Sequence, residues 1–358
     1  MSNPEANVDW QLTLDTRRIL LTLLFLIPLV IYMMIVGPSQ IWEALISLNL
    51  QLALIAFLLF YLSAFIRAFR WQIFLESLDK NKAPPSLIDL FIILIFSASI
   101  NNAFPIRMGD LYRPYELNNS YNYSFLSAAS TIIFEKALDI FAMLGLIIGV
   151  VVLQGTSELV GLNELVQTLL FLIAVLIAFM IFLLLLQNAR TAQIFVSLVN
   201  SLATRTSKRI ISDEKLKTRE IAHQVRLLIG DKRNFIVGLF SSILIWINAG
   251  VIFWIVLVSA GLDVPILPAI LVMLLAALIG NSIFGVAGLG QLPFMIGFLV
   301  ILGVTNHAAT SACLAYLIIT LWLVIPIGIL AHYCKTQASE PEGVKNLNDP
   351  LTKNHADS

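Results

Sequence analysis

Long apolar stretches without a charged residue recur along this chain, and polar and apolar positions do not alternate within them. Segments 19–36, 45–66 and 166–186 each approach or exceed the roughly 20 residues that a helix needs to cross about 30 Å of hydrocarbon. The strands of a membrane barrel would instead alternate apolar and polar residues. The pattern therefore predicts an all-α polytopic membrane protein.

Composition supports this class of protein. Hydrophobic residues make up 59% of the chain and charged residues 12%, whereas a soluble domain is about 25% charged. The formal net charge is zero, which indicates no global attraction for polyanions, and we expect no nucleic-acid partner. The two cysteines, Cys313 and Cys334, fall within or beside apolar segments, so we interpret both as packing residues.

The distribution of basic residues predicts the topology. Arg17 and Arg18 precede the first span, and the following loop, 37–44, has no Lys or Arg, so the positive-inside rule places the N-terminus in the cytoplasm. The linker 188–233 contains ten Lys or Arg against four acids. It is therefore predicted to be cytoplasmic, and the C-terminus with it.

The second span ends among Arg67, Arg70 and Trp71. Basic residues followed by Trp are what a helix end at the cytoplasmic interface requires. We therefore favour interfacial anchoring over headgroup contact for these three residues.

Segment 87–104 must begin and end on the cytoplasmic side if both flanking assignments hold. One crossing cannot do this, and the apolar run is interrupted by Asn101, Asn102 and Pro105. Proline also disfavours helix at the residue before it, here Phe104. The sequence therefore predicts a re-entrant segment, which is tolerated at membrane depth where it is buried in protein or lines a watery cavity.

The C-terminal half has the same arrangement from the opposite face. Span 235–260 leads to a loop without a base, and the last span, about 310–332, ends near Lys335. Segment 266–304 must then start and finish outside, and glycines break it at 285–293. Two broken segments entering from opposite faces predict an inverted repeat, an architecture in which transporters place substrate near the midplane.

The predicted architecture is about six full spans plus two re-entrant or broken helical hairpins, in a plasma membrane of the bacterial inner-membrane type. Its parts are a cytoplasmic segment 1–16, a first membrane half 17–187 broken near 101–113, a basic cytoplasmic linker 188–233, a second membrane half 234–333 broken near 285–293, and a disordered cytoplasmic tail 334–358.

Charged residues gather between positions 107 and 139. Ionisable groups at membrane depth are costly, so they mark a site or pair with one another. Glu135 and Asp139 are four residues apart, which places both carboxylates on one helix face. The residues we expect to bind substrate are Arg107, Asp110, Arg113, Glu135, Lys136 and Asp139.

Two interpretations of this group stay open. In the functional one, Arg107 and Arg113 bind an anionic headgroup through their guanidinium forks, and the two carboxylates orient them or titrate. In the structural one, the acids only neutralise Arg107, Arg113 or Lys136 inside the bundle.

A second set of residues is assigned either to headgroup contact or to structure: Arg67, Arg70, Asn102, Gly288 and Gly290. For the asparagines we favour bonds to interrupted backbone. The histidines lack metal-ligand spacing, and no P-loop or GxSxG motif is present. We expect no metal, no cofactor and no catalytic residue.

Four motifs carry a resemblance to a known family: RAFRW at 67–71, NAFPIRMGDLYR at 102–113, EKALD at 135–139, and the glycine-rich stretch 285–303. With them the chain resembles the flippase-like transmembrane domain of lysylphosphatidylglycerol synthases and their stand-alone relatives. In that family the first break usually reads Pro, a basic residue, Gly, an acid and Arg. The matching positions here are Pro105, Arg107, Gly109, Asp110 and Arg113.

The chain differs from the family's pattern in two respects. Gln291, Leu292 and Pro293 follow the glycines where the family usually has Glu, and no base lies between positions 285 and 332. Bifunctional members also carry a soluble aminoacyl-transferase domain after the membrane part, whereas 334–358 alone follow the last span here. We therefore do not expect lipid aminoacylation.

Three functions are compatible with these features. The first, which we favour, is a flippase-like transporter of an anionic phospholipid or lipid-linked intermediate. The second is a membrane-embedded transferase using a lipid-phosphate donor, with Asp110 and Glu116, or Glu135 and Asp139, holding a divalent metal. The third is a non-catalytic membrane subunit of a separately encoded lipid-modifying enzyme or glycosyltransferase. Membrane lipids are the expected partners in all three.

Overall fold

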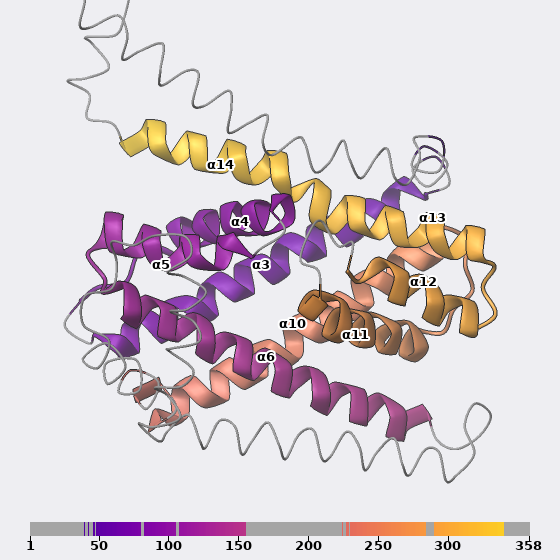
Figure 1. Cartoon of the computed structure of the whole chain (residues 1–358), viewed down its shortest axis with the longest axis horizontal. Coiled ribbons are helices and arrows are strands. Elements are labelled where there is room, and N and C mark those ends of the chain that lie inside the picture. Colours follow the sequence, from indigo (N-terminus) through magenta and orange to yellow (C-terminus); the bar gives the residue numbers. More distant parts are fainter. Residues whose placement is uncertain are drawn as a thin grey trace, which may run out of the picture.

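The computed structural model describes residues 48–79, 82–104, 107–154, 230–283 and 290–339, with a few isolated positions before 48 and between 224 and 228. Every regular element in these ranges is helical, which confirms the all-α prediction (Figure 1). Predicted spans 19–36 and 166–186, nearly all of the linker 188–233, and the tail beyond 339 lie outside the described residues. The elements are α3 (Leu50–Leu78), α4 (Leu87–Ala103), α5 (Met108–Tyr121), α6 (Phe125–Gln154), α10 (Lys232–Ser259), α11 (Ile266–Ile283), α12 (Leu292–Ile301), α13 (Asn306–Leu317), η1 (Ile318–Trp322) and α14 (Val324–Ser339).

Four helices of the described chain are long and apolar enough to cross a membrane, which confirms the polytopic class. They are Leu50–Leu78, Phe125–Leu153, Lys232–Ser259 and Asn306–Thr336. The last begins a few residues earlier than the predicted span 310–332.

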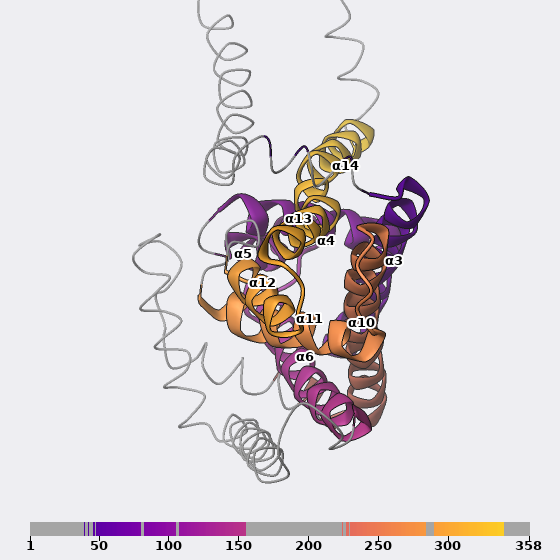
Figure 2. The same cartoon turned by 90° about the vertical axis from the view of Figure 1, so that its right-hand side faces the viewer.

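Helices α3 and α10 lie side by side and antiparallel (Figure 2). Each begins at a polar cap, Asn49 for α3 and Asp231 for α10, whose side chain accepts backbone N–H bonds of the first turn. At one end, the Asn49 amide donates to the Ser259 carbonyl at 3.0 Å. At the other, Arg233 lies 3.8 Å from Glu76. The start of α3 and the end of α10 therefore share one end of the bundle.

The first broken pair consists of α4 and α5. Phe104, which precedes Pro105, has extended backbone with φ −113° and ψ 144° and ends α4, as expected before proline. The interruption is shorter than the predicted 101–113, because Asn101 and Asn102 lie within α4 and α5 has begun by Met108. A polar side chain does not by itself end a helix when tertiary partners satisfy it.

The two helices of this pair are closely packed. Ser97 Oγ donates to the Gly109 carbonyl at 2.8 Å, and a Cβ at Gly109 would overlap the Ser97 carbonyl oxygen. Lys335 on α14 contacts both Asp89, near the start of α4, and the Tyr121 hydroxyl, at the end of α5. The pair thus begins and ends at the same end of the bundle, as a re-entrant hairpin requires; its membrane depth stays a prediction.

The second broken pair is α11 and α12, joined through residues 284–289, which include Gly288 and lie outside the described residues. A Cβ at Gly280 on α11 would overlap backbone atoms of Gln291, the residue that caps α12. Each half thus contains a long helix, a broken pair and a further long helix or helix series, in that order. The predicted inverted repeat requires this order, and the inverted relation itself stays a prediction.

The last span changes its backbone geometry at η1, a π-helical turn between α13 and α14. Pro326 has no backbone N–H, so it cannot donate the helical hydrogen bond to the Trp322 carbonyl, four residues earlier. The π-helical turn lies directly before this missing bond. Helix α4 supports this region, because Ser99 Oγ donates to the Val324 carbonyl at 2.8 Å and Asn102 Nδ2 to the Leu321 carbonyl at 3.0 Å.

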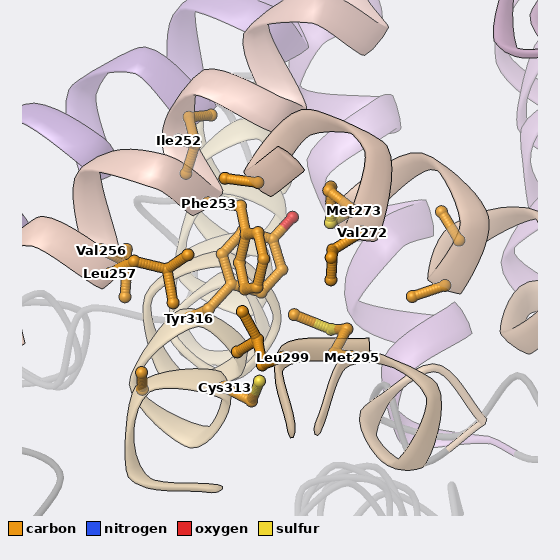
Figure 3. Close-up of a cluster of buried hydrophobic side chains, with 14 of the residues drawn as sticks. Ile252, Phe253, Val256, Leu257, Val272, Met273, Met295, Leu299, Cys313 and Tyr316 are labelled. Atoms are coloured by element: carbon orange, nitrogen blue, oxygen red, sulfur yellow. The ribbon is translucent and has the colours of Figure 1, made fainter. Parts of the chain in front are cut away.

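The largest apolar cluster joins α10 to α11, α12 and α13 (Figure 3). Phe253 and Tyr316 meet edge to face at its centre, with ring centroids 5.3 Å apart. Met295, Leu299 and Cys313 pack beside them and are fully buried. Because lipid tails are as apolar as these side chains, close packing rather than exclusion from water holds such helices together.

Candidate functional site

Charged residues from three helices meet at one place in the bundle, which we call the ionic cluster. Helix α3 contributes Arg67 and Arg70, and α6 contributes Glu135, Lys136 and Asp139. The first turns of α5, with the residue that precedes it, complete the cluster with Arg107, Asp110 and Arg113. All six residues predicted to bind substrate therefore lie together, and Arg67 and Arg70 join them.

Four of these residues form a buried quartet: Arg70, Arg113, Glu135 and Asp139. Glu135 Oε1 lies 3.1 Å from Arg70 Nη2, and its Oε2 lies 2.9 Å from Arg113 Nη2. Arg70 also reaches Asp139 Oδ1 at 2.7 Å. The four side chains are between 0% and 7% exposed, and two positive charges balance two negative ones.

Helical spacing explains how α6 serves the quartet. Glu135 and Asp139 are one turn apart on the same face, so one guanidinium, that of Arg70, reaches both carboxylates. A fork of planar N–H donors suits this double contact better than a lysine ammonium would.

Uncharged residues complete the surroundings of the quartet. Ser242 on α10 accepts from Arg70 at 2.6 Å and donates to Asp139 at 2.8 Å. The guanidinium of Arg113 stacks on Trp71, 4.1 Å from the ring centroid, and the Trp71 indole donates to Thr131 at 3.0 Å. Sequence reasoning did not identify Ser242 or Thr131, because an isolated hydroxyl in an apolar span carries no distinguishing pattern.

The interfacial assignment of Arg70 and Trp71 is wrong. Both side chains are fully buried between helices rather than exposed at a helix end. Basic residues near a cytoplasmic helix end satisfy the positive-inside rule whether they face water or protein, so the rule could not separate these cases. Ion pairs with Glu135 and Asp139 on α6 stabilise Arg70 inside the bundle.

The remaining four charged residues form the accessible rim of the cluster. Arg107, Lys136, Arg67 and Asp110 have side chains 41%, 37%, 27% and 22% exposed. Asp110 lies 3.1 Å from Arg107 and 3.6 Å from Lys136. Arg67 approaches Asp139 at 3.5 Å, and its guanidinium lies 5.9 Å from the centroid of Trp246.

Asp110 is fixed by its position in the first turn of α5. Its amide donates to Asn101 Oδ1 at 3.3 Å, and Asn101 Nδ2 donates back to its carboxylate at 3.1 Å. Burial raises the pKa of Asp110, but the positive charges of Lys136, Arg107 and Arg113 lower it, and the net result is a pKa of about 2. The carboxylate is therefore ionised at neutral pH.

Among the described residues, the second break contributes no side chain to the ionic cluster. Gly290 lies beside Gly280 in the α11–α12 pair, and Gly288 is outside the described residues. Asn102 bonds to the backbone before α14, so its contact is structural. The structure brings together the predicted charged residues of the first half.

The carboxylate pairs considered for metal binding are already engaged. Glu135 and Asp139 face arginines, Asp110 faces Arg107 and Lys136, and Glu116 accepts a hydrogen bond from Ser120 at 2.8 Å. In the described part of the chain, no three His, Cys, Asp or Glu side chains are grouped as a metal site would need.

Apolar spanning helices around a buried ionic cluster define an integral membrane protein with a polar site inside its helical bundle. Residues 18–328 match the family described as the lysylphosphatidylglycerol synthase TM region. The chain belongs to this family, which confirms the resemblance found in its motifs.

Several relatives extend this result. A UPF0104 membrane protein of Methanothermobacter thermautotrophicus is 24% identical over 321 residues, covering 87% of this chain and 94% of that protein. A UPF0104 membrane protein of Methanocaldococcus jannaschii is 27% identical over 154 residues, 42% of this chain and 44% of its own. Glycosyltransferase AglD of Haloferax volcanii is 26% identical over 166 residues, 45% of this chain and 26% of AglD. No solved structure gives a significant match.

Proposed function

We propose that this protein binds the anionic headgroup of a phospholipid or lipid-linked intermediate at the rim of the ionic cluster and moves the lipid between leaflets. The observation that carries the proposal is the accessible set of cations, Arg67, Arg107 and Lys136, beside a broken helix in a membrane protein. Ionisable groups kept at such a position by default mark a functional site.

The two parts of the cluster have different roles in this proposal. The quartet satisfies its own charges and fixes the helices α3, α5 and α6 relative to one another. The rim cations are held by these helices yet keep part of their surface accessible. A phosphate oxygen could accept bonds from the fork of Arg107.

The start of α5 strengthens the attraction for an anion. Arg107 is the residue that caps this helix, and its side chain makes no capping bond. The first N–H groups and the helix dipole make a helix N-terminus favourable for a phosphate. Asp110 in the same turn supplies one negative charge, which the rim cations exceed.

Leaflet exchange in proteoliposomes tests the proposal. Fluorescent anionic and zwitterionic lipids are reconstituted with wild-type protein, with Arg107→Ala, or with the matched control Arg233→Ala, an exposed arginine at the start of α10. A hydrogen bond to a charged group contributes about 1.5–3 kcal/mol, so we expect anionic exchange to slow by about 10- to 100-fold in Arg107→Ala and to be unchanged in the control. Equal exchange by all three proteins, or equal exchange of zwitterionic lipid, would contradict the proposal.

The match to AglD favours one second candidate. AglD is named a glycosyltransferase, and the match covers 26% of it, so most of that protein lies outside the shared region. A chain of this family could accordingly serve a separate glycosyltransferase as its membrane subunit. Co-purification of such an enzyme, without lipid exchange by the isolated chain, would support this candidate over the transporter.

A further inference from the structure

We infer that the lipid headgroup taken by this protein carries two negative charges, as a phosphomonoester or a diphosphate does, rather than the single charge of a phosphodiester. This inference rests on the proposed function and names the substrate class of the same site. It follows from the charge balance of the ionic cluster.

The buried quartet needs no further counter-charge. Arg70 and Arg113 face Glu135 and Asp139 at 2.7–3.1 Å, and Ser242 satisfies more of the hydrogen bonding of Arg70 and Asp139. An added anion would disturb a group that is already neutral.

The rim is not neutral. Arg67, Arg107 and Lys136 carry three positive charges against the single negative charge of Asp110, whose lowered pKa keeps it ionised. The second oxygen of Asp139 contacts Arg67 at 3.5 Å, but this carboxylate is already counted against Arg70. Among the described residues, two positive charges of the rim therefore remain.

Other acids of the described chain are engaged elsewhere. Glu76 faces Arg233 and Asp89 faces Lys335. Glu116, on α5, accepts from Ser120. Within the described ranges, no acid other than Asp110 and Asp139 forms an ion pair with the rim cations.

A charge without a counter-charge inside a membrane protein raises the free energy of the folded state. A ligand with one negative charge would leave the rim at plus one, whereas a ligand with two would neutralise it. A terminal phosphate has a second pKa near 6, so a phosphomonoester carries about two negative charges above pH 7. The rim should therefore discriminate between lipids by phosphate charge.

The test compares phosphatidic acid, a phosphomonoester, with phosphatidylglycerol, a phosphodiester, at matched acyl chains. Binding is measured by the lipid-dependent rise in Tm of the purified full chain, and exchange in proteoliposomes. At pH 8 we expect at least a 10-fold preference for phosphatidic acid in both measurements. The preference should shrink at pH 5, where the monoester loses a charge, with phosphatidylglycerol as the reference for any change in the protein.

Charge variants of the rim refine the test. Lys136→Met lowers the excess by one charge and should reduce the preference at least three-fold, whereas Lys136→Arg should retain it. Equal binding and exchange of the two lipids, both weakened in Arg107→Ala, would overturn the inference while leaving the proposed function in place. Preferential binding of phosphatidic acid without exchange would support the inference and contradict transport. Absence of both binding and exchange would overturn both.

Discussion

At the residue scale, Glu135 is the central group of the site. Its two oxygens separate two arginines from different helices, Arg70 on α3 and Arg113 on α5. All three side chains are excluded from water, and Arg70 also pairs with Asp139 at 2.7 Å. The carboxylate therefore holds three helices together through one residue.

Glu135→Gln should destabilise the protein strongly. The amide keeps the size of the side chain but leaves the quartet with a net positive charge. Removing one partner of a buried ion pair costs about 3–5 kcal/mol. The measurement is Tm in detergent, with Glu116→Gln as the control, because Glu116 lies outside the quartet and accepts a hydrogen bond from Ser120 on its own helix. A Tm equal to that of the control would show that the quartet is not a structural element.

Asp110 gives a prediction for pH. Its pKa of about 2 in the folded protein lies below the ordinary value of about 3.9, so its ionised form stabilises the fold. This contribution is fully present above about pH 4 and is lost as the pH falls toward 2. We expect the Tm difference between wild type and Asp110→Asn to be constant from pH 5 to 8 and to shrink below pH 4. A difference that changes instead between pH 5 and 8 would contradict this assignment.

Sequence patterns predicted which residues gather here but only part of how they pair. The spacing of Glu135 and Asp139 correctly predicted a shared helix face. Of the expected partners Arg107, Arg113 and Lys136, Arg113 does pair with Glu135, but the residue that contacts both acids is Arg70. Arg70 lies 65 residues earlier in the chain than Glu135, and the packing of α3 against α6 leaves no signal in a single sequence.

At the element scale, both broken pairs depend on a glycine at a close contact. Gly109 on α5 lies against the backbone of Ser97 on α4, and Gly280 on α11 lies against the backbone of Gln291. Backbone cannot move aside as a flexible side chain can. Small residues that allow such close approach are characteristic of helix packing in membranes.

Gly109→Ala should separate α4 from α5. The added methyl group overlaps the Ser97 carbonyl oxygen, and overpacking of this kind costs about 1–3 kcal/mol. Gly145→Ala is the matched control, because a Cβ at Gly145 on α6 meets nothing within 4 Å and alanine favours helix by up to about 1 kcal/mol. We expect a lower Tm for the first variant and an equal or higher Tm for the second. The reverse order would contradict the packing described here.

The position of the first break was predictable, whereas its length was not. Pro105 determines the end of α4 through its effect on Phe104. The sequence predicts Asn101 and Asn102 as part of the break, but their amides bond to Asp110 and to the Leu321 carbonyl. The second of these partners belongs to the other half of the chain, so tertiary contact keeps α4 helical to Ala103.

At the scale of the whole molecule, the described basic residues gather toward one end of the bundle. Arg233 and Glu76 meet there, as do Lys335 and Asp89. The opposite end, where Asn49 meets Ser259, leads to a loop with Asp263 and no base. The positive-inside rule predicts that this basic end is the cytoplasmic one.

Cysteine labelling in intact cells tests this orientation. In a background without Cys313 and Cys334, Asp263→Cys should react with an impermeant thiol reagent added from outside. Asn119→Cys, near the end of α5, should react only after permeabilisation. Both side chains are exposed in the structure, so access to the reagent depends on the side of the membrane. Labelling in the opposite sense would invert the topology.

The pairing of Arg70 with acids on α6 also affects how the chain enters the membrane during synthesis. Helix α3 is made first, so Arg67 and Arg70 reach the bilayer before Glu135 and Asp139 exist. A lone arginine at the centre of an inserting helix costs about 2.5–3.5 kcal/mol. Arg70 lies eight residues before the end of α3, about 12 Å along a helix axis. At this distance the side chains of Arg67 and Arg70 can extend to the membrane interface until α6 is inserted. The burial of Arg70 must therefore follow the arrival of α6, which makes assembly of this site a late event in the biogenesis of the protein.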